Sequence, residues 1–141
     1  MAGAKFKFEV YTPYRLFFSQ DVEAITLRLS DGEVGIYAGH SLFTAPVVNC
    51  IMKIKDRKGV WKHAFVSNGI IEVKKTKTVL LSDAAEWPEE IDAERAKKSK
   101  DDAMSVIKDS SFKFENAIAG AKLERAEMRL KVLESVVKPS V

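Results

Sequence analysis

The sequence predicts a β + α protein in two parts, an N-terminal antiparallel β-sandwich followed by a C-terminal antiparallel two-helix hairpin. Two observations carry this prediction: apolar residues alternate with polar ones in short runs up to Glu86, and they recur at helical spacing after Ile91. Between these parts, Trp87-Pro88 ends the extended pattern, because a proline keeps the residue before it away from helical angles. We therefore expect two domains, residues 1–86 and residues 87–141.

The first part contains a series of short strand patterns. Phe6, Phe8 and Val10 alternate with charged residues, which is the period of a strand buried on one face. Similar β patterns cover residues 22–29, 44–54, 61–66, 70–73 and 78–81. Turn signals separate them at residues 12–14, 31–32 and 56–59. So many short strands at this spacing are typical of a compact antiparallel sandwich or barrel.

The segment 91–96 (IDAERA) opens the helical part. Glu89, Glu90 and Asp92 put negative charge where the positive end of a helix dipole is expected. Asp92 and Arg95 are three residues apart, so on a helix they share a face and either pair or address a third group. An ordinary helix start explains the same spacing.

Two helical stripes follow this opening. The first is narrow and made mostly of small residues: Ala96, Ser99, Ala103, Val106 and Ile107. A break at residues 109–111 offers a cap for the second helix. The second stripe consists of Phe114, Ile118, Ala121, Met128, Val132 and Val136, and Pro139 closes the tail. These stripes predict two antiparallel helices joined as a hairpin.

Arg125 interrupts the second apolar stripe, with Lys122 and Arg129 three residues before and four residues after it. One interpretation is that its aliphatic stem packs while the guanidinium reaches water. The other is that Lys122, Arg125 and Arg129 together bind an anion, which is either a phosphate or the acidic residues of another protein.

The composition excludes several classes of protein. The net charge of +3 is too small to predict a nucleic-acid partner. The lone cysteine, Cys50, rules out an internal disulfide and a multi-cysteine metal site, and its apolar neighbours suggest a buried, inert thiol. No run approaches the roughly 18 apolar residues of a membrane span, so we expect no direct membrane insertion and a membrane link only through a partner.

The sequence also lacks the residue sets of common catalytic sites. His40 and His63 are the two histidines, and we assign His63 only a structural place on a strand. No nucleophile–base or metal-binding motif is present, so we expect no catalytic residues, no metal and no enzymatic activity of this chain alone. Residues 31–40 are glycine-rich but lack the Gly-Lys-Ser/Thr ending of a phosphate loop, which favours turn geometry.

Four segments, in this order and spacing, resemble the epsilon subunits of F-type ATP synthase. They are residues 32–40 (GEVGIYAGH), 67–73 (SNGIIEV), 81–86 (LSDAAE) and 91–96 (IDAERA). Each motif is weak alone, but together they are specific and extend along nearly the whole chain. The resemblance implies a peripheral central-stalk subunit on the cytoplasmic face of the cell (inner) membrane.

The resemblance also implies partners and sites. The sandwich would dock on the gamma subunit and the c-ring, with Glu33 and His40 in a loop near the ring. The hairpin would inhibit ATP hydrolysis, with Lys122, Arg125 and Arg129 meeting an acidic segment of the catalytic beta subunits. Some similar family members bind ATP through an Ile/Leu-Asp-x-x-Arg-Ala motif. Here Asp92, Arg95, Arg125 and Arg129 would hold a regulatory ATP, although no cofactor is required.

The sequence departs from the family pattern at one position, and one alternative function is also considered. Asn116 stands where relatives that bind ATP well carry an arginine, so we expect weak binding. The alternative is a free-standing β-sandwich that binds a ligand or a protein and carries a nucleotide-sensing hairpin. Such a module would stay monomeric when mixed with rotor subunits.

Overall fold

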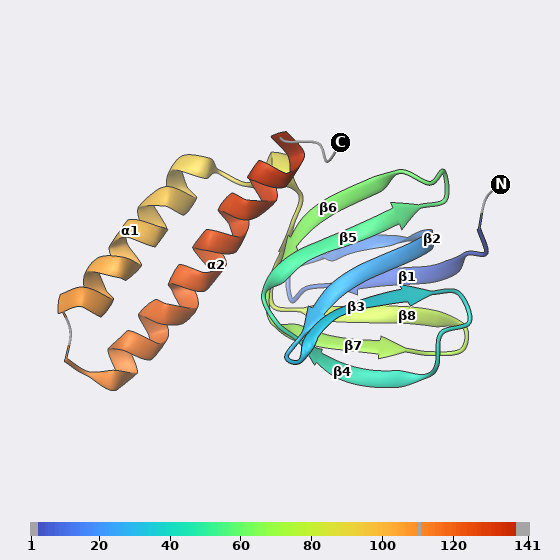
Figure 1. Ribbon diagram of the computed structural model, residues 1–141, viewed down its shortest axis with the longest axis horizontal. Helices are drawn as coiled ribbons and strands as arrows, with labels where there is room; N and C mark the ends of the chain where they lie inside the picture. The colour runs from blue at the N-terminus through green and yellow to red at the C-terminus, as the bar shows by residue number, and fades with distance from the viewer. Residues whose placement is uncertain (1–2, 110, 138–141) are drawn as a thin grey trace. The chain divides into compact units, whose positions relative to one another are not determined.

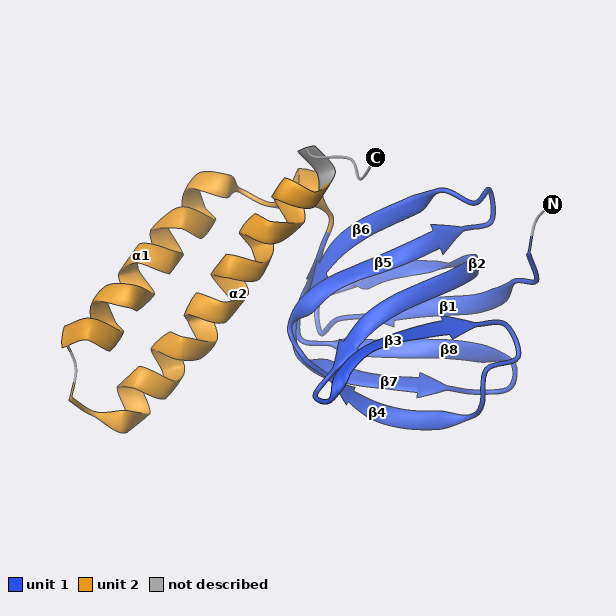
Figure 2. Ribbon diagram, viewed as in Figure 1, with its two compact units in different colours: residues 1–86 blue, residues 87–141 orange. Residues whose placement is uncertain are grey.

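The protein is represented by a computed structural model that describes residues 3–109 and 111–137, the last two without their side chains. The chain divides into two compact units, residues 1–86 and residues 87–141 (Figure 2). The expectations that involve Ser110, Pro139 and the side chain of Val136 lie outside the described residues.

The first unit is built from strands (Figure 1). In chain order they are β1 (Phe6–Tyr11), β2 (Leu16–Leu29), β3 (Gly32–Tyr37), β4 (Phe43–Val47), β5 (Cys50–Asp56), β6 (Trp61–Val66), β7 (Gly69–Val73), β8 (Lys77–Ser82) and β9 (Ala85–Glu86). Their order across the sheet is β1-β8-β7-β4-β2-β5-β6-β9, with β3 on β2 and a further pairing of β1 with β2. The long strand β2 therefore belongs to both layers, and the predicted β-sandwich is confirmed.

The sandwich differs from the expectation in one pairing. Strand β1 runs parallel to β8, with Val10 opposite Leu80 and Tyr11 opposite Leu81, while the other pairs are antiparallel. The sheet is thus mixed, although mostly antiparallel. Alternation within a strand specifies which face is buried but says nothing about the direction of a neighbour that lies far away in sequence.

Two strand boundaries also differ. Strand β2 begins at Leu16 rather than Val22, because the polar run Ser19 to Asp21 pairs with β1 and hides the strand signal. The predicted run 44–54 is wrong as a single strand, since β4 ends at Val47 and β5 starts at Cys50. Between them the Asn49 Oδ1 accepts hydrogen bonds from the Ser67 hydroxyl at 3.0 Å and the Asn68 amide at 3.0 Å.

The core of the sandwich is apolar and tightly covered. Phe8 and Val10 are fully buried, as the alternation predicted, and the Phe8 ring lies 5.9 Å from that of Phe18. Other fully buried side chains come from both layers: Ile25, Leu27, Ile36, Met52, Ile54, Phe65, Ile71 and Leu80. Cys50 is buried among them, as expected, and this burial raises the pKa of its thiol to about 11.

The second unit contains a short 3-10 helix, η1 (Pro88–Glu90), and two helices, α1 (Ala93–Asp109) and α2 (Lys113–Val137). Helices α1 and α2 contact each other and run in opposite directions, and α2 also contacts η1 (Figure 1). This arrangement confirms the helical hairpin. Neither helix is long and apolar enough to cross a membrane.

The predicted stripe of α2 is wrong over the first turns and right at Val132, which is fully buried. Phe114 is 78% exposed and Ile118 is 56% exposed, whereas Ala119 and Ala126 are buried. The apolar seam of α2 instead follows positions three and four apart: Ala119, Leu123, Ala126 and Leu130. Large side chains suggested the wrong stripe, because small alanines are what allow two helices to approach closely. Arg125 therefore lies beside the seam, half-buried, rather than inside it.

Helix α1 follows its predicted stripe in part. Ala96 and Ala103 are buried, and Ser99 is half-buried. Val106 and Ile107 are exposed, by 41% and 37%. The prediction is thus right over the first turns of α1 and wrong over the last ones.

Candidate functional site

The start of α1 is stabilised by Asp92. Its Oδ1 accepts a hydrogen bond from the Arg95 backbone N–H at 3.1 Å, and its carbonyl accepts one from Ala96 at 3.0 Å. Asp92 is therefore the N-cap of α1, which is the ordinary helix start that the spacing allowed. The contact involves the Arg95 main chain, and the Arg95 side chain is exposed.

A cavity lined by residues of both α1 and α2 shows which sides of the two helices lie next to each other. Its volume is about 250 Å³, and it is lined by Asp102, Ala103 and Val106 from α1 and by Glu115, Ile118, Ala119 and Lys122 from α2. Asp102 thus lies on the same side of the hairpin as Ile118 and Lys122.

Of the four predicted ATP residues, Asp92 caps α1, and Arg95, Arg125 and Arg129 occur one heptad farther from the α1–α2 loop on these same flanks. Seven residues are about two helical turns, so the position of Asp102 repeats at Arg95. By the same step, Ile118 repeats at Arg125 and Lys122 at Arg129. The antiparallel arrangement therefore brings Arg95, Arg125 and Arg129 to one level on one side of the hairpin. Arg125 and Arg129 are half-buried there.

Lys122 lies about one turn nearer the loop, and Asn116 lies farther along in the same direction. The rise of a helix separates Asn116 from Arg125 by about 13 Å along the axis. The hairpin thus has four cations on one side, Arg95, Lys122, Arg125 and Arg129, which together can bind a polyanion. Asn116 stands apart from this set.

Glu33 and His40 do not share a loop. Glu33 is exposed on strand β3, opposite Arg28 of β2, whereas His40 follows the turn that ends β3. Only Ala38 to His40 leave the strand, with Gly39 at a φ of 79°. The strand alone separates Glu33 from Tyr37 by roughly 13 Å. The expected single loop is wrong, because residues 32–37 alternate and pair along β2.

Sequence reasoning missed an exposed apolar row on the sandwich. Cross-strand pairs connect Pro46 with Ile70, Ile70 with Leu81, Leu81 with Tyr11, and Tyr11 with Leu16. Leu16, Ile70 and Leu81 are 52%, 50% and 54% exposed. Cross-strand partners point to one face, so these side chains form a continuous row. The signal was present in Ile70-Ile71 and Leu80-Leu81, where one residue fills the core and its neighbour faces outward.

The described residues hold no cluster of His, Cys, Asp and Glu that could bind a metal ion. The pKa of His63 is lowered, first by burial and then by the charge of Lys53, which is its cross-strand neighbour. This environment matches the structural place that the sequence assigned to His63.

A β-sandwich followed by a contacting helical pair is the architecture of a class of ATP synthase subunits, the delta/epsilon chains. Residues 5–88 match the family described as "ATP synthase, Delta/Epsilon chain, beta-sandwich domain". Residues 89–134 match the family described as "ATP synthase, Delta/Epsilon chain, long alpha-helix domain".

Two relatives are named ATP synthase epsilon chain. One, from Caldanaerobacter subterraneus subsp. tengcongensis, is 43% identical over 90% of this chain and 92% of its own length. Another, from Caldicellulosiruptor saccharolyticus, is 42% identical over 93% of this chain and 95% of its own. The chain therefore belongs to the family of ATP synthase epsilon chains, and it is a non-catalytic subunit.

Solved structures show the same fold at low identity. A chain in the cryo-EM structure of the Euglena gracilis mitochondrial ATP synthase OSCP/F1/c-ring aligns with a TM-score of 0.80 and 22% identity, over 98% of this chain and 84% of that one. A chain in the Tetrahymena thermophila mitochondrial ATP synthase central stalk and c-ring aligns with a TM-score of 0.69 and 15% identity, over 94% and 99%. These likenesses concern the fold alone.

Proposed function

We propose that this chain is a rotor subunit of the ATP synthase central stalk, whose sandwich docks on the gamma subunit through the exposed apolar row. Family membership and the similarity to a chain of the Tetrahymena thermophila central stalk and c-ring support a place in the central stalk. The main evidence for docking is the exposed apolar row, because a contiguous exposed apolar patch marks a protein contact more often than scattered apolar residues do. The chain would thus reach the cytoplasmic face of the membrane peripherally, within the complex, and family membership favours this role over a free-standing module.

A paired substitution tests the row. Ile70→Asp with Leu81→Asp puts two charges into the middle of the row without touching Ile71 or Leu80 in the core. We expect the variant to fold, as judged by circular dichroism, but to be lost from purified enzyme and from a pull-down with gamma. Leu42→Asp is the matched control, since Leu42 is 65% exposed outside the row. Equal retention of the variant and wild type would contradict this docking surface.

For the c-ring contact, we propose the turn between β2 and β3, where Glu33 is exposed next to Gly32. A two-residue connection between paired strands holds Glu33 in a defined place, as a contact with a polar ring surface requires. Glu33→Lys should weaken coupling of proton flow to ATP synthesis. His40 lies at the other end of β3, so His40→Ala should leave coupling intact if only the turn near Glu33 meets the ring.

We further propose that the hairpin binds a regulatory ATP through Arg95, Arg125 and Arg129. The three arginines lie at the same height along the hairpin and on the same side of it. A triphosphate could therefore contact all of them, because guanidinium groups bind phosphates through paired, charge-assisted hydrogen bonds. Isothermal titration with ATP tests this proposal in wild type and Arg95→Ala, with Lys97→Ala as a control on the same helix. Saturable binding that Arg95→Ala loses and Lys97→Ala keeps is expected. No binding at millimolar ATP, or equal binding by all three proteins, would contradict it.

The affinity of this site is expected to be modest. An arginine at position 116 whose side chain reached the phosphates would add one charge-assisted hydrogen bond, worth about 1.5–3 kcal/mol at a partly buried site, or one to two decades in dissociation constant, and Asn116 does not supply it. Asn116→Arg tests that reason directly. Because Asn116 lies toward the loop, an arginine there has to extend along the helix to reach the phosphates, so no gain in affinity would mean that Asn116 does not limit binding.

A further inference from the structure

The large exposed apolar side chains of the helical unit gather at one end. Among the described residues of this unit, they are Met104, Val106, Ile107, Phe112, Phe114 and Ile118. All of them lie in the last turns of α1, the first turns of α2 or the connection between the two helices. We call this apolar end of the hairpin the tip. Arg95, Arg125 and Arg129 lie toward the other end, so the proposed ATP site does not explain why the tip is apolar.

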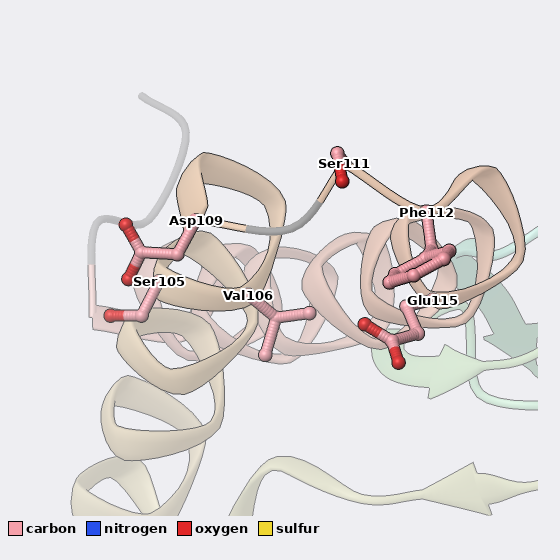
Figure 3. A pocket seen from close by; sticks show the side chains of 6 residues that line it. All are labelled: Ser105, Val106, Asp109, Ser111, Phe112 and Glu115. Atoms are coloured by element: carbon pink, nitrogen blue, oxygen red, sulfur yellow. The ribbon is translucent and has the colours of Figure 1, made fainter.

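The tip is hollowed as well as apolar. A cavity of about 440 Å³ is lined by Ser105, Val106, Asp109, Ser111, Phe112 and Glu115. Figure 3 shows Val106 between the α1 residues Ser105 and Asp109 on one side and Phe112 and Glu115 on the other. Val106 and Glu115 also line the cavity of about 250 Å³ between the helices. The two hollows thus adjoin at Val106 and Glu115, and we call them together the tip groove.

The dimensions of the tip groove suit a short helix. Its lining residues run from Ser111 in the connection to Lys122 of α2, and residues 113–122 alone rise about 14 Å, or roughly two and a half helical turns. Ala103 and Ala119 lie at its floor in the second hollow. A third helix would lie over this floor between the exposed side chains of α1 and α2, and the hairpin offers no strand edge to which an extended peptide could pair.

The charges along the tip groove indicate the charge of the partner helix that would bind there. Asp102, Asp109 and Glu115 line it, whereas Lys122 contributes the one cation among the lining residues and lies at one end. Carboxylates along an apolar groove favour a partner with lysine or arginine beside its apolar side chains. They disfavour an anionic lipid surface. They also disfavour a second copy of the tip, because a two-fold contact would bring Asp109 and Glu115 of both copies together.

We propose that the tip groove is a docking site for one basic amphipathic helix of a neighbouring ATP synthase subunit. The apolar face of that helix would cover Val106, Phe112 and Ile118, and its basic flank would meet Asp109 and Glu115. The hairpin and its partner would then form a local three-helix bundle. This inference rests on the proposed place of the chain in the assembled enzyme, but it uses neither the apolar row nor the ATP site.

Photo-crosslinking in the assembled enzyme tests this proposal. The photoreactive residue p-benzoylphenylalanine replaces Phe112 in one preparation and Ile118 in another. Replacement of Glu94, an exposed residue near the start of α1, is the matched control. Retention of the chain in the purified complex is measured first, so that a failure of sandwich docking is separated from a failure of the tip groove.

Both tip positions are expected to form an adduct with the same helical segment of another subunit, rich in lysine and arginine, while the Glu94 position does not. Glu115→Lys combined with Asp102→Lys should lower the adduct yield about fivefold, because like charges replace favourable pairs at the rim. Glu94→Lys should leave the yield unchanged. Adducts only with an acidic segment, with lipid or with a second copy, or no adduct from an enzyme that retains the chain, would overturn the proposal.

Discussion

The Asp92 carboxylate accepts a hydrogen bond from the Arg95 backbone N–H across 3.1 Å, which makes Asp92 the cap of α1. Asp92→Ala should therefore lower the free energy of unfolding of the hairpin by about 1 kcal/mol, whereas Asp92→Asn should keep most of it. Thermal unfolding followed by circular dichroism measures both. Equal unfolding of Asp92→Ala and wild type would mean that the cap contributes little.

Removal of the cationic flank should raise ATP hydrolysis by the assembled enzyme. Lys122, Arg125 and Arg129 lie along one side of α2, and we propose that the hairpin inhibits hydrolysis when these cations contact an acidic segment of the catalytic beta subunits. The triple alanine variant is compared with a variant that replaces three exposed residues of α1, Lys97, Lys98 and Lys108. An unaltered hydrolysis rate in the α2 variant would remove this flank from the inhibitory mechanism.

A fragment that ends at Glu86 should fold by itself. The buried core of Phe8, Ile25, Phe65 and Leu80 lies within residues 1–86, and the pairing of β9 with β6 ends at Glu86 itself. We expect a β-type circular dichroism spectrum, a cooperative thermal transition and binding to gamma. An unfolded fragment would show that the sandwich needs the helical residues for stability.

Two glycine substitutions should change stability in opposite directions. A Cβ on Gly69 would overlap the Leu81 carbonyl oxygen, so Gly69→Ala should destabilise the sandwich by about 1–3 kcal/mol. A Cβ on Gly120 meets nothing within 4 Å, so Gly120→Ala should stabilise α2 by about 0.5–1 kcal/mol. Urea unfolding measures both changes. A neutral Gly69→Ala would mean that β7 and β8 separate easily at this point.

The Cys50 thiol should be unreactive in the folded protein. Burial raises its pKa to about 11, so almost no thiolate is present at pH 8, and the thiolate is the reactive form. Alkylation by iodoacetamide at pH 8, followed by mass spectrometry, should be slow in buffer and rapid in denaturant. Rapid labelling of the native protein would indicate that the strands around Cys50 open readily.

Local patterns in the sequence determined the β-sandwich, the helical hairpin and the change between them at Trp87-Pro88. The period of apolar residues reports directly on which face of a strand is buried, and Phe8 and Val10 behave accordingly. The four motifs also identified the family, which the relatives confirmed. The start of α1 at Asp92 was readable for the same reason, since a helix cap is a local interaction.

Only the tertiary structure decided which distant residues meet. The parallel pairing of β1 with β8 and the row from Leu16 to Pro46 depend on strands that are remote in sequence. The burial of Ala119 and Ala126 was not predicted, because close packing of two helices favours small side chains at the contact as well as large ones. Glu33 is separated from His40 because β3 is an extended strand that pairs along β2. Contacts between distant segments are set by shape and register, to which no single local pattern gives access.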